Sequence, residues 1–181
     1  MTKFVTRFAP SPTGNLHIGS ARTALLNYIV SKKISSSKFY LRIEDTDKVR
    51  SKKEFSKNII DGLSWLGIKW ENEIQIQSQR IERHQEVVKD LLEKKYAYKC
   101  NCSEEKLIEK RRFIKTNKNI PKKLCTDCKN NDGIQNLSEN FVVRLRIPEE
   151  GELKIKDKIQ GDVVVKNIEL DDFILLRKDK T

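Results

Sequence analysis

Apolar and polar residues in the first half of the chain change periodicity in a regular order. Lys3–Phe8 and Phe39–Ile43 are short runs typical of buried strands, and each is followed by apolar residues at helical spacing. The first helical stripe contains Ala21, Ala24, Leu25, Tyr28 and Ile29, and the second contains Phe55, Ile59, Ile60, Leu63 and Leu66. The order strand–helix–strand–helix predicts an α/β fold that opens a parallel sheet.

Local signals predict the two ends of the second helix. Ser51 and Glu54 have the S-x-x-E spacing of a capping box, which satisfies free backbone N–H groups where a helix begins. Gly67 follows the apolar stripe, at the position where a glycine commonly ends a helix. A third helix is predicted over Ser78–Lys94, and its apolar stripe contains Ile81, Val88, Leu91 and Leu92.

The pattern changes after this third helix. Residues 100–128 are basic and poor in large apolar side chains. Strand-like runs then follow at Phe141–Ile147, Gly161–Val165 and Ile168–Leu176. We therefore expect two units, residues 1–82 and residues 83–181, of which the second is a small α+β unit. A parallel sheet opened by the first unit would need further strands, so we expect the chain to be a fragment.

The formal net charge of +11 is concentrated in one part of the chain. Between Lys94 and Lys129, twelve Lys and Arg residues against four Asp and Glu residues give +8. Such a cluster favours a polyanionic partner, because each phosphate that a protein contacts releases counterions. A solvated, lysine-rich surface is the alternative explanation. The candidates for phosphate contact are Lys110, Arg111, Arg112, Lys122 and Lys123.

The sequence has no apolar run of signal-peptide or membrane-spanning length. The first residues, MTKFVTRF, lack an apolar core, and the runs near Val163 and Ile174 are far too short to cross a bilayer. We therefore expect a cytoplasmic protein without a membrane partner. Its four cysteines should stay reduced in that compartment.

A loop lies between the first predicted strand and the first predicted helix, which is where open α/β sheets bind ligands. Gly14 and Gly19 allow close backbone approach, and the helix N-terminus offers free N–H groups to a phosphate. His17 stands at the start of this helix, where an imidazole can donate to a phosphate oxygen. The alternative is a histidine that only caps or packs at the end of the helix.

The longer string RFAPSPTGNLHIG, from Arg7 to Gly19, resembles the first signature of class I aminoacyl-tRNA synthetases in the glutamate and glutamine subgroup. Ser20 departs from the usual histidine of that signature. The resemblance continues at residues 39–47, 64–70, 96–107 and 159–181. It implies the first half of a Rossmann-like class I catalytic fold in residues 1–82. Residues 83–181 would then hold an inserted, zinc-bearing α+β unit that binds the tRNA acceptor stem, and the start of the return to the catalytic fold.

The resemblance also implies an activity, namely glutamate–tRNA ligation. Glutamate attacks the α-phosphate of ATP in the presence of Mg²⁺, and the glutamyl-adenylate passes its acyl group to the 3′ end of tRNA(Glu). The residues that match the ATP-binding positions are Thr13, Gly14, His17 and Gly19, with His17 and Gly19 in the catalytic role. The residues that match the glutamate-binding positions are Arg7, Ala9, Ser11 and Glu44.

The chemistry of two of these residues suits glutamate. Arg7 can bind the side-chain carboxylate with two charge-assisted hydrogen bonds, and Glu44 can accept from the α-ammonium. For Arg7 the alternative is a surface arginine at a strand end. For residues 44–47 the alternatives are an acidic strand end and a metal site. The neighbouring Asp45 and Asp47 have no assigned role.

Cys100-x-Cys102 and Cys125-x-x-Cys128 form two close pairs separated by 22 residues. Two such pairs in a reducing compartment suit a tetrahedral zinc ion. A site closed by four thiolates leaves no position for water, so we expect zinc to be structural. Free cysteines and a redox C-x-x-C are the alternatives. The other histidine, His84, lies on a predicted helix stripe and is expected to pack there.

The family's second, lysine-containing ATP signature and its anticodon-binding region are not found before Thr181. We therefore expect the chain alone to be inactive, and we expect a monomer. Three alternatives remain open at this point. They are an enzyme resembling glutamyl-queuosine tRNA(Asp) synthetase, a glutaminyl enzyme, and a non-catalytic zinc-bearing RNA-binding module.

Overall fold

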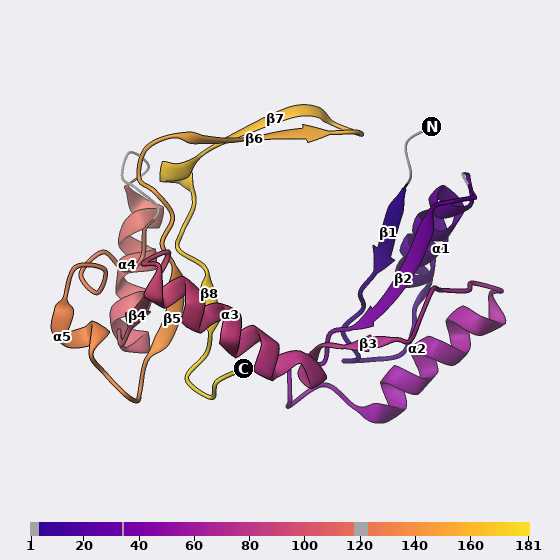
Figure 1. Ribbon diagram of the computed structural model, residues 1–181, viewed down its shortest axis with the longest axis horizontal. Coiled ribbons are helices and arrows are strands. Elements are labelled where there is room, and N and C mark those ends of the chain that lie inside the picture. The colour runs from indigo at the N-terminus through magenta and orange to yellow at the C-terminus, as the bar shows by residue number, and fades with distance from the viewer. Residues whose placement is uncertain (1–3, 34, 118–122) are drawn as a thin grey trace. The chain divides into compact units, whose positions relative to one another are not determined.

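The structure is a computed structural model that describes residues 4–33, 35–117 and 123–181 (Figure 1). The chain divides into two compact units, residues 1–82 and residues 83–181. Each unit has its own sheet and its own apolar core. The two units are therefore described separately.

The first unit is a parallel sheet with crossover helices. Its strands and helices alternate as β1 (Val5–Phe8), α1 (Ile18–Lys32), β2 (Lys38–Ile43), α2 (Lys53–Trp65) and β3 (Gln75–Ile76). The strand order is β1-β2-β3, and both neighbouring pairs are parallel. The predicted α/β order is thus confirmed, although Lys3, at the start of the first predicted strand, lies outside the described residues.

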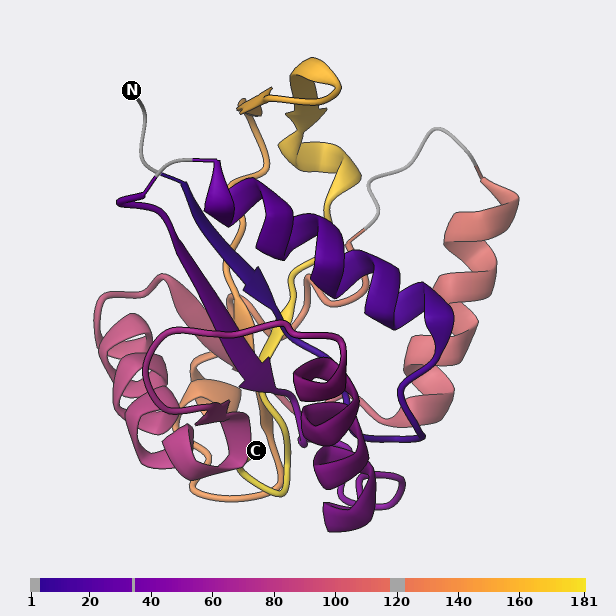
Figure 2. The same cartoon turned by 90° about the vertical axis from the view of Figure 1, so that its right-hand side faces the viewer.

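The core of this unit follows from strict alternation along β2. Phe39, Leu41 and Ile43 are each no more than 2% exposed and share one face of the strand. Ile59 and Leu63 of α2 join the same apolar cluster. Helix α1 packs along β1 and β2, as Figure 2 shows. The sheet therefore holds the ends of α1 and α2 beside the carboxyl ends of the strands.

The two ends of α2 agree with the sequence to different degrees. Gly67 has φ +73° and ends the helix, with its N–H bonded to the carbonyl of Ser64, so this prediction is confirmed. The capping box is wrong. Lys52 is the N-cap residue, and the Ser51 hydroxyl is buried without a hydrogen-bond partner among the described residues. The turn that bonds the Ser51 N–H to the Asp47 carbonyl places Ser51 one residue too early to cap.

The second unit begins within α3 (Ile81–Glu93), which follows a 3-10 turn at Gln77–Arg80 in the first unit. It then contains β4 (Ala97–Cys100), α4 (Glu104–Thr116), α5 (Asp132–Gln135) and β5 (Val142–Leu145). After these come β6 (Glu152–Asp157), β7 (Gly161–Lys166), a 3-10 turn at Asn167–Glu169 and β8 (Ile174–Leu176). Strands β4, β5 and β8 form an antiparallel sheet, and β6 with β7 forms a separate hairpin that Figure 1 shows as a long ribbon.

Several features of this unit were not predicted. The run at Ile168–Leu176 forms a strand only over its last three residues, because the 3-10 turn and an extended segment precede them. Strands β4 and β6 and helix α4 were missed. The residues of β6 and α4 are mostly polar or charged, and β4 has only four residues. His84 is exposed on α3 and does not pack, since Val88 is the buried residue of that helix. None of the helices in the described ranges is both long and apolar enough to span a membrane.

Candidate functional site

The loop between β1 and α1 is anchored by both neighbouring segments of its unit. The Glu44 N–H, just after β2, donates to the Pro10 carbonyl at 2.9 Å. The Leu16 N–H donates to Asn58 Oδ1 of α2 at 2.9 Å. Leu16 also packs over Gly62, where an added Cβ would lie 2.7 Å from Leu16 Cδ2. A larger residue at position 62 would require the Leu16 side chain to shift, so the loop packs closely on α2.

His17 is the N-cap residue of α1. Its backbone is extended, and its Nδ1 accepts from the Gly19 N–H at 3.2 Å. Because Nδ1 is the acceptor in this bond, the neutral ring carries its proton on Nε2. Nε2 lies 2.9 Å from the Ser20 hydroxyl. The helix cap thus fixes the tautomer that presents an N–H donor on the outer side of the ring.

The loop encloses a pocket of about 200 Å³ at this helix start. The lining residues include Ser11, Thr13, Gly14 and His17. A Cβ on Gly19 would meet the His17 ring at 3.1–3.2 Å, so Gly19 leaves room for the capping imidazole. Gly14 is different, because a Cβ there would meet nothing within 4 Å. Its glycine is not required by packing within the described residues.

The predicted glutamate-binding residues lie around the same edge of the sheet. Arg7 is an exposed residue of β1 that pairs with Tyr40 in the parallel register. Ala9 and Ser11 flank Pro10, whose carbonyl bonds the backbone of Glu44. The Glu44 carboxylate is ion-paired with Arg42 through Oε1, so among the residues that the structure describes Oε2 is left for another donor.

Asp45 and Asp47, which the sequence left without a role, hold local structure. The Asp45 carboxylate accepts from both the N–H and the hydroxyl of Ser78, at 2.9 and 2.5 Å. It therefore caps the 3-10 turn that precedes α3. Asp47 accepts from the backbone and the guanidinium of Arg50, and these hydrogen bonds lower its pKa.

The four cysteines of the second unit converge on one point. Cys100 ends β4, Cys102 follows it, and the other two lie on the loop before α5. Their sulfur atoms all lie within 4.8 Å of one another. The Sγ of Cys125 is 3.4 Å from that of Cys100 and 3.3 Å from that of Cys102. The Sγ of Cys128 is 3.6 Å from that of Cys102.

This cluster fits a tetrahedral metal ion. Zinc–sulfur bonds of about 2.3 Å give sulfur–sulfur edges of about 3.8 Å, close to the observed separations. Cys100, Cys125 and Cys128 are no more than 2% exposed. The Cys125 thiol, the Cys102 N–H and the Arg144 guanidinium lower the pKa of Cys100 to about 4, whereas burial raises that of Cys102 to about 11. A metal ion that binds here displaces the thiol protons.

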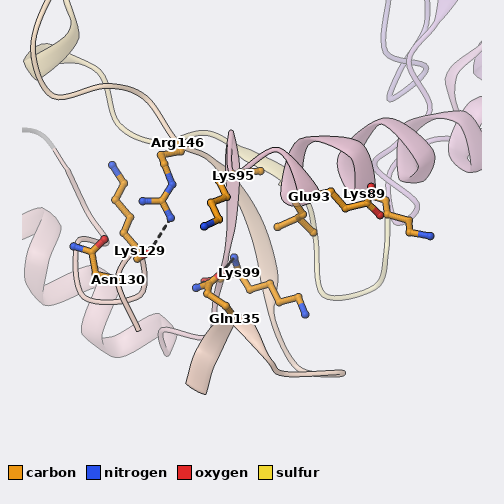
Figure 3. Close-up of a pocket in the computed structure, with 10 residues that line it drawn as sticks. Lys89, Glu93, Lys95, Lys99, Lys129, Asn130, Gln135 and Arg146 are labelled. Carbon is orange, nitrogen blue, oxygen red and sulfur yellow. Dashed lines mark hydrogen bonds between the residues drawn. The ribbon is translucent and has the colours of Figure 1, made fainter. Parts of the chain in front are cut away.

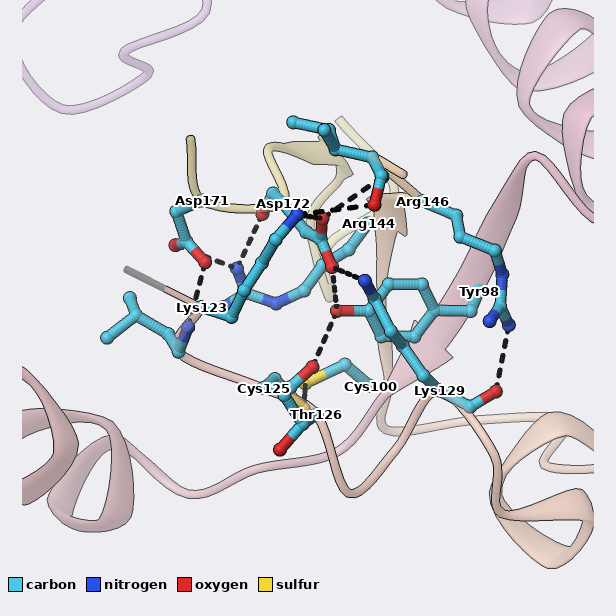
Figure 4. A network of polar contacts seen from close by, with 12 residues as sticks. Tyr98, Cys100, Lys123, Cys125, Thr126, Lys129, Arg144, Arg146, Asp171 and Asp172 are labelled. Carbon is cyan, nitrogen blue, oxygen red and sulfur yellow. Dashed lines mark hydrogen bonds and ion pairs between the residues drawn. The ribbon is translucent and has the colours of Figure 1, made fainter. Parts of the chain in front are cut away.

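A buried ionic network lies against the cysteine loop (Figure 4). Asp172, 1% exposed, accepts from Lys129 Nζ at 2.7 Å and from Lys123 Nζ at 3.1 Å. The Tyr98 hydroxyl lies 2.9 Å from both the Asp172 carboxylate and the Cys125 carbonyl. Burial alone would raise the pKa of Asp172, but these three donors outweigh it and lower that pKa. The network ties the cysteine loop to β4 and to the segment before β8.

The network corrects one sequence-based prediction. Lys123 was a candidate for phosphate contact, but its side chain is 3% exposed and its ammonium is paired inside the unit. Lys110 pairs with Asp127 at 3.2 Å, while Arg111 and Arg112 lie on exposed positions of α4. Lys122 lies outside the described residues. The sequence could not reveal Lys123 as buried, because its partner is 49 residues away.

Comparisons with known proteins show which family the chain resembles. The sequence model of the family "tRNA synthetases class I (E and Q), catalytic domain" matches residues 3–181. Glutamate–tRNA ligase 2 of Zymomonas mobilis is 48% identical over 98% of this chain, which covers 37% of that protein. Glutamate–tRNA ligase of Lawsonia intracellularis is 46% identical over 100% of this chain, which covers 38% of it. The chain thus spans less than half the length of these relatives.

Solved structures give the same similarity. The crystal structure of a glutamate tRNA ligase from Elizabethkingia meningosepticum, in complex with its amino acid, superposes with a TM-score of 0.78 at 28% identity. The match covers 99% of this chain and 39% of that one. The glutamate–tRNA synthetase of Elizabethkingia anophelis matches with the same TM-score.

Proposed function

The chain belongs to the class I tRNA synthetase catalytic-domain family for glutamate and glutamine, and we propose on that basis that it forms the front part of a glutamate–tRNA ligase. Within the chain, the proposal rests on His17. Its Nδ1 accepts from the Gly19 N–H at the start of α1, and this leaves its Nε2 as an N–H donor there. The relatives favour glutamate over glutamine as the amino acid, since those described above are glutamate–tRNA ligases.

In the proposed reaction, ATP binds with its phosphates at the N-terminus of α1. The His17 Nε2–H then donates to a phosphate oxygen instead of contacting the Ser20 hydroxyl. The free N–H groups at the start of the helix face the same phosphate. Thr13, Gly14 and Gly19 shape this part of the loop. The glutamate α-carboxylate then attacks the α-phosphate, the bond to pyrophosphate breaks, and glutamyl-adenylate forms. His17 and the helix start stabilise charge that grows in the transition state.

Glutamate would lie at the same sheet edge, next to Ala9 and Ser11. We assign its side-chain carboxylate to Arg7 and its α-ammonium to the free Oε2 of Glu44. The Arg42–Glu44 ion pair orients the Glu44 carboxylate for this contact.

Replacing Arg7 with glutamine should raise the KM for glutamate about 30-fold while leaving the KM for ATP within about 2-fold, because a charge-assisted bidentate contact is lost. Steady-state aminoacylation by a protein that contains this chain and the rest of a glutamate–tRNA ligase measures both constants. Arg50→Gln, which removes an exposed guanidinium paired with Asp47, is the control. An unchanged KM for glutamate in Arg7→Gln would remove Arg7 from the site.

We further propose that the cysteine cluster holds one structural zinc ion through Cys100, Cys102, Cys125 and Cys128. When bound, the ion cross-links the end of β4 to the loop before α5. Four thiolate ligands leave no open position, so the ion stabilises the fold and takes no part in the reaction.

Cys125→Ser should therefore reduce bound zinc from one equivalent to less than about 0.2, since a hydroxyl is a poor replacement for a buried thiolate ligand. Elemental analysis of the purified chain measures the stoichiometry. Ser103→Ala removes the cap of α4 beside the cluster but no ligand, so it should keep its zinc. Equal zinc contents in the wild type and both variants, or none in any of them, would exclude the site.

The second unit, we propose, binds the acceptor end of tRNA(Glu), which matches its basic charge between Lys94 and Lys129. ATP, Mg²⁺ and glutamate complete the reactants, and a monomer in the cytoplasm is sufficient for the reaction.

The second candidate function, a zinc-bearing RNA-binding module without catalysis, would keep RNA binding but lack adenylate formation. Amino-acid activation by the longer protein separates the two.

A further inference from the structure

A cationic pocket of about 710 Å³ lies in the second unit, apart from the cysteine cluster. It is formed by the end of α3, the first residues of β4, the segment before α5 and the residue after β5 (Figure 3). Five of its described lining residues are positively charged and one, Glu93, is negatively charged. The positive residues are Lys89, Lys95, Lys99, Lys129 and Arg146.

Two of the five cations are already engaged within the fold. The Lys129 ammonium is paired with Asp172 at 2.7 Å. Lys99 donates to the Leu137 carbonyl at 2.6 Å, and Figure 3 shows its side chain extending away from Lys95 and Arg146. The charge of Lys129 is therefore neutralised within the unit, whereas Lys99, bonded to a neutral carbonyl, keeps its charge but directs it away from Lys95 and Arg146.

Lys95 and Arg146 make no ion pair with a carboxylate in the part of the chain that the structure describes. The Arg146 guanidinium lies 5.3 Å from the centre of the Tyr98 ring and donates to the Lys129 carbonyl at 2.8 Å. These contacts fix its plane without neutralising its charge. Figure 3 shows the Lys95 side chain directed toward Arg146. Two like charges that face the same space repel each other unless an anion lies between them.

Lys95 also occupies a backbone position that favours glycine. Lys95 lies two residues after the last residue of α3 and has φ +60°. Its N–H donates to the Leu92 carbonyl, and the N–H of Tyr96 donates to the Leu91 carbonyl. This is the arrangement in which helices usually place a glycine. A lysine there is strained relative to glycine, so glycine can replace it without a backbone penalty.

We propose that this pocket binds a backbone phosphate of RNA through Lys95 and Arg146. A guanidinium held in one plane suits two phosphate oxygens, and the lysine adds a point charge beside it. The inference rests on the proposed function only for the choice of RNA as the source of the phosphate. It places the RNA contact at the end of α3, and not on α4, where the sequence suggested it.

Lys95→Gly tests the proposal, because it removes the cation at a position where glycine relieves backbone strain. We expect it to weaken the binding of a short hairpin RNA with a single-stranded 3′ end about 5- to 10-fold near 0.1 M salt. The slope of log affinity against log salt should fall by about 0.7–0.9. Fluorescence anisotropy with the 181-residue chain measures both. Lys180→Gly is a matched control, since Lys180 has φ +61° and does not line the pocket.

Equal effects of Lys95→Gly and Lys180→Gly, or an unchanged salt slope in Lys95→Gly, would overturn the proposal. A second arm titrates the wild type and Lys95→Gly with inorganic phosphate by NMR. A phosphate response that needs Lys95, together with unchanged RNA affinity, would identify a site for free anions and refute the RNA contact. None of these measurements requires glutamate or ATP, so a failed ligase assay would leave this inference intact.

Discussion

Replacing His17 with alanine should slow glutamyl-adenylate formation about 100-fold in a protein that contains this chain and the rest of the ligase. One oriented donor to developing charge is typically worth about 3 kcal/mol in the transition state. We propose that the Nε2–H of His17 is such a donor, because the hydrogen bond from the Gly19 N–H to Nδ1 leaves Nε2 as the protonated nitrogen. Single-turnover formation of the adenylate measures the effect on this step alone.

The same substitution also removes a helix cap, which costs about 1 kcal/mol of stability, so a second variant is needed. Asparagine at position 17 keeps an oxygen that can accept from the Gly19 N–H, but it lacks the imidazole donor. His17→Asn should therefore restore the stability of α1 without restoring the rate. His84→Ala, at the chain's other histidine, should leave the rate unchanged because that ring is exposed on α3. Full activity in His17→Asn would reduce the role of His17 to capping.

Replacing Asp172 with asparagine should destabilise the second unit by about 3–5 kcal/mol. The change keeps the shape of the side chain but leaves the ammonium groups of Lys123 and Lys129 buried beside a neutral amide. A loss of this size is a large part of the roughly 5–15 kcal/mol that stabilises a typical domain. The cysteine loop should open with it, because Tyr98 links Asp172 to the Cys125 carbonyl.

Hydrogen exchange read on peptides from both units measures this effect within one sample. Protection should fall in residues 83–181 and stay unchanged in the first unit, whose Trp65 and Trp70 give an independent fluorescence signal. Asp162→Asn, an exposed change on β7, is the control. Unchanged protection around Cys125 in Asp172→Asn would contradict the account of the network.

The pH dependence of this stabilisation has a definite sign. The pKa of Asp172 is lower in the folded chain than its ordinary value of about 3.9. Its contribution is therefore complete above that ordinary value and is lost as the pH falls through the folded pKa. Acid should weaken the second unit of the wild type more than that of Asp172→Asn.

The parts of the fold that the sequence predicted are those fixed by local pattern. Alternation along β2 and the glycine at position 67 each depend on neighbours only a few residues away. The start of α2 shows the limit of such patterns. Ser51 has the right spacing from Glu54, but the turn at Asp47 shifts the helix start by one residue.

The parts that the sequence could not predict depend on distant partners. Asp172 meets Tyr98 across 74 residues and Lys123 across 49, and no local pattern marks either contact. Likewise, the three lysines within residues 122–129 do not reveal from the sequence alone whether they face solvent or a buried carboxylate. The sequence could predict the cysteine cluster, because metal ligands are marked by residue type and spacing.

We propose that this chain forms the glutamate- and ATP-binding front of a tRNA ligase. The most direct test measures attachment of glutamate and of glutamine to tRNA(Glu), with and without ATP, by a protein that contains this chain and the rest of the enzyme. We expect ATP-dependent attachment of glutamate, little attachment of glutamine, and a loss of about 100-fold in His17→Ala. Preferential attachment of glutamine, or ATP-dependent charging that is unaffected in His17→Ala, would contradict the account.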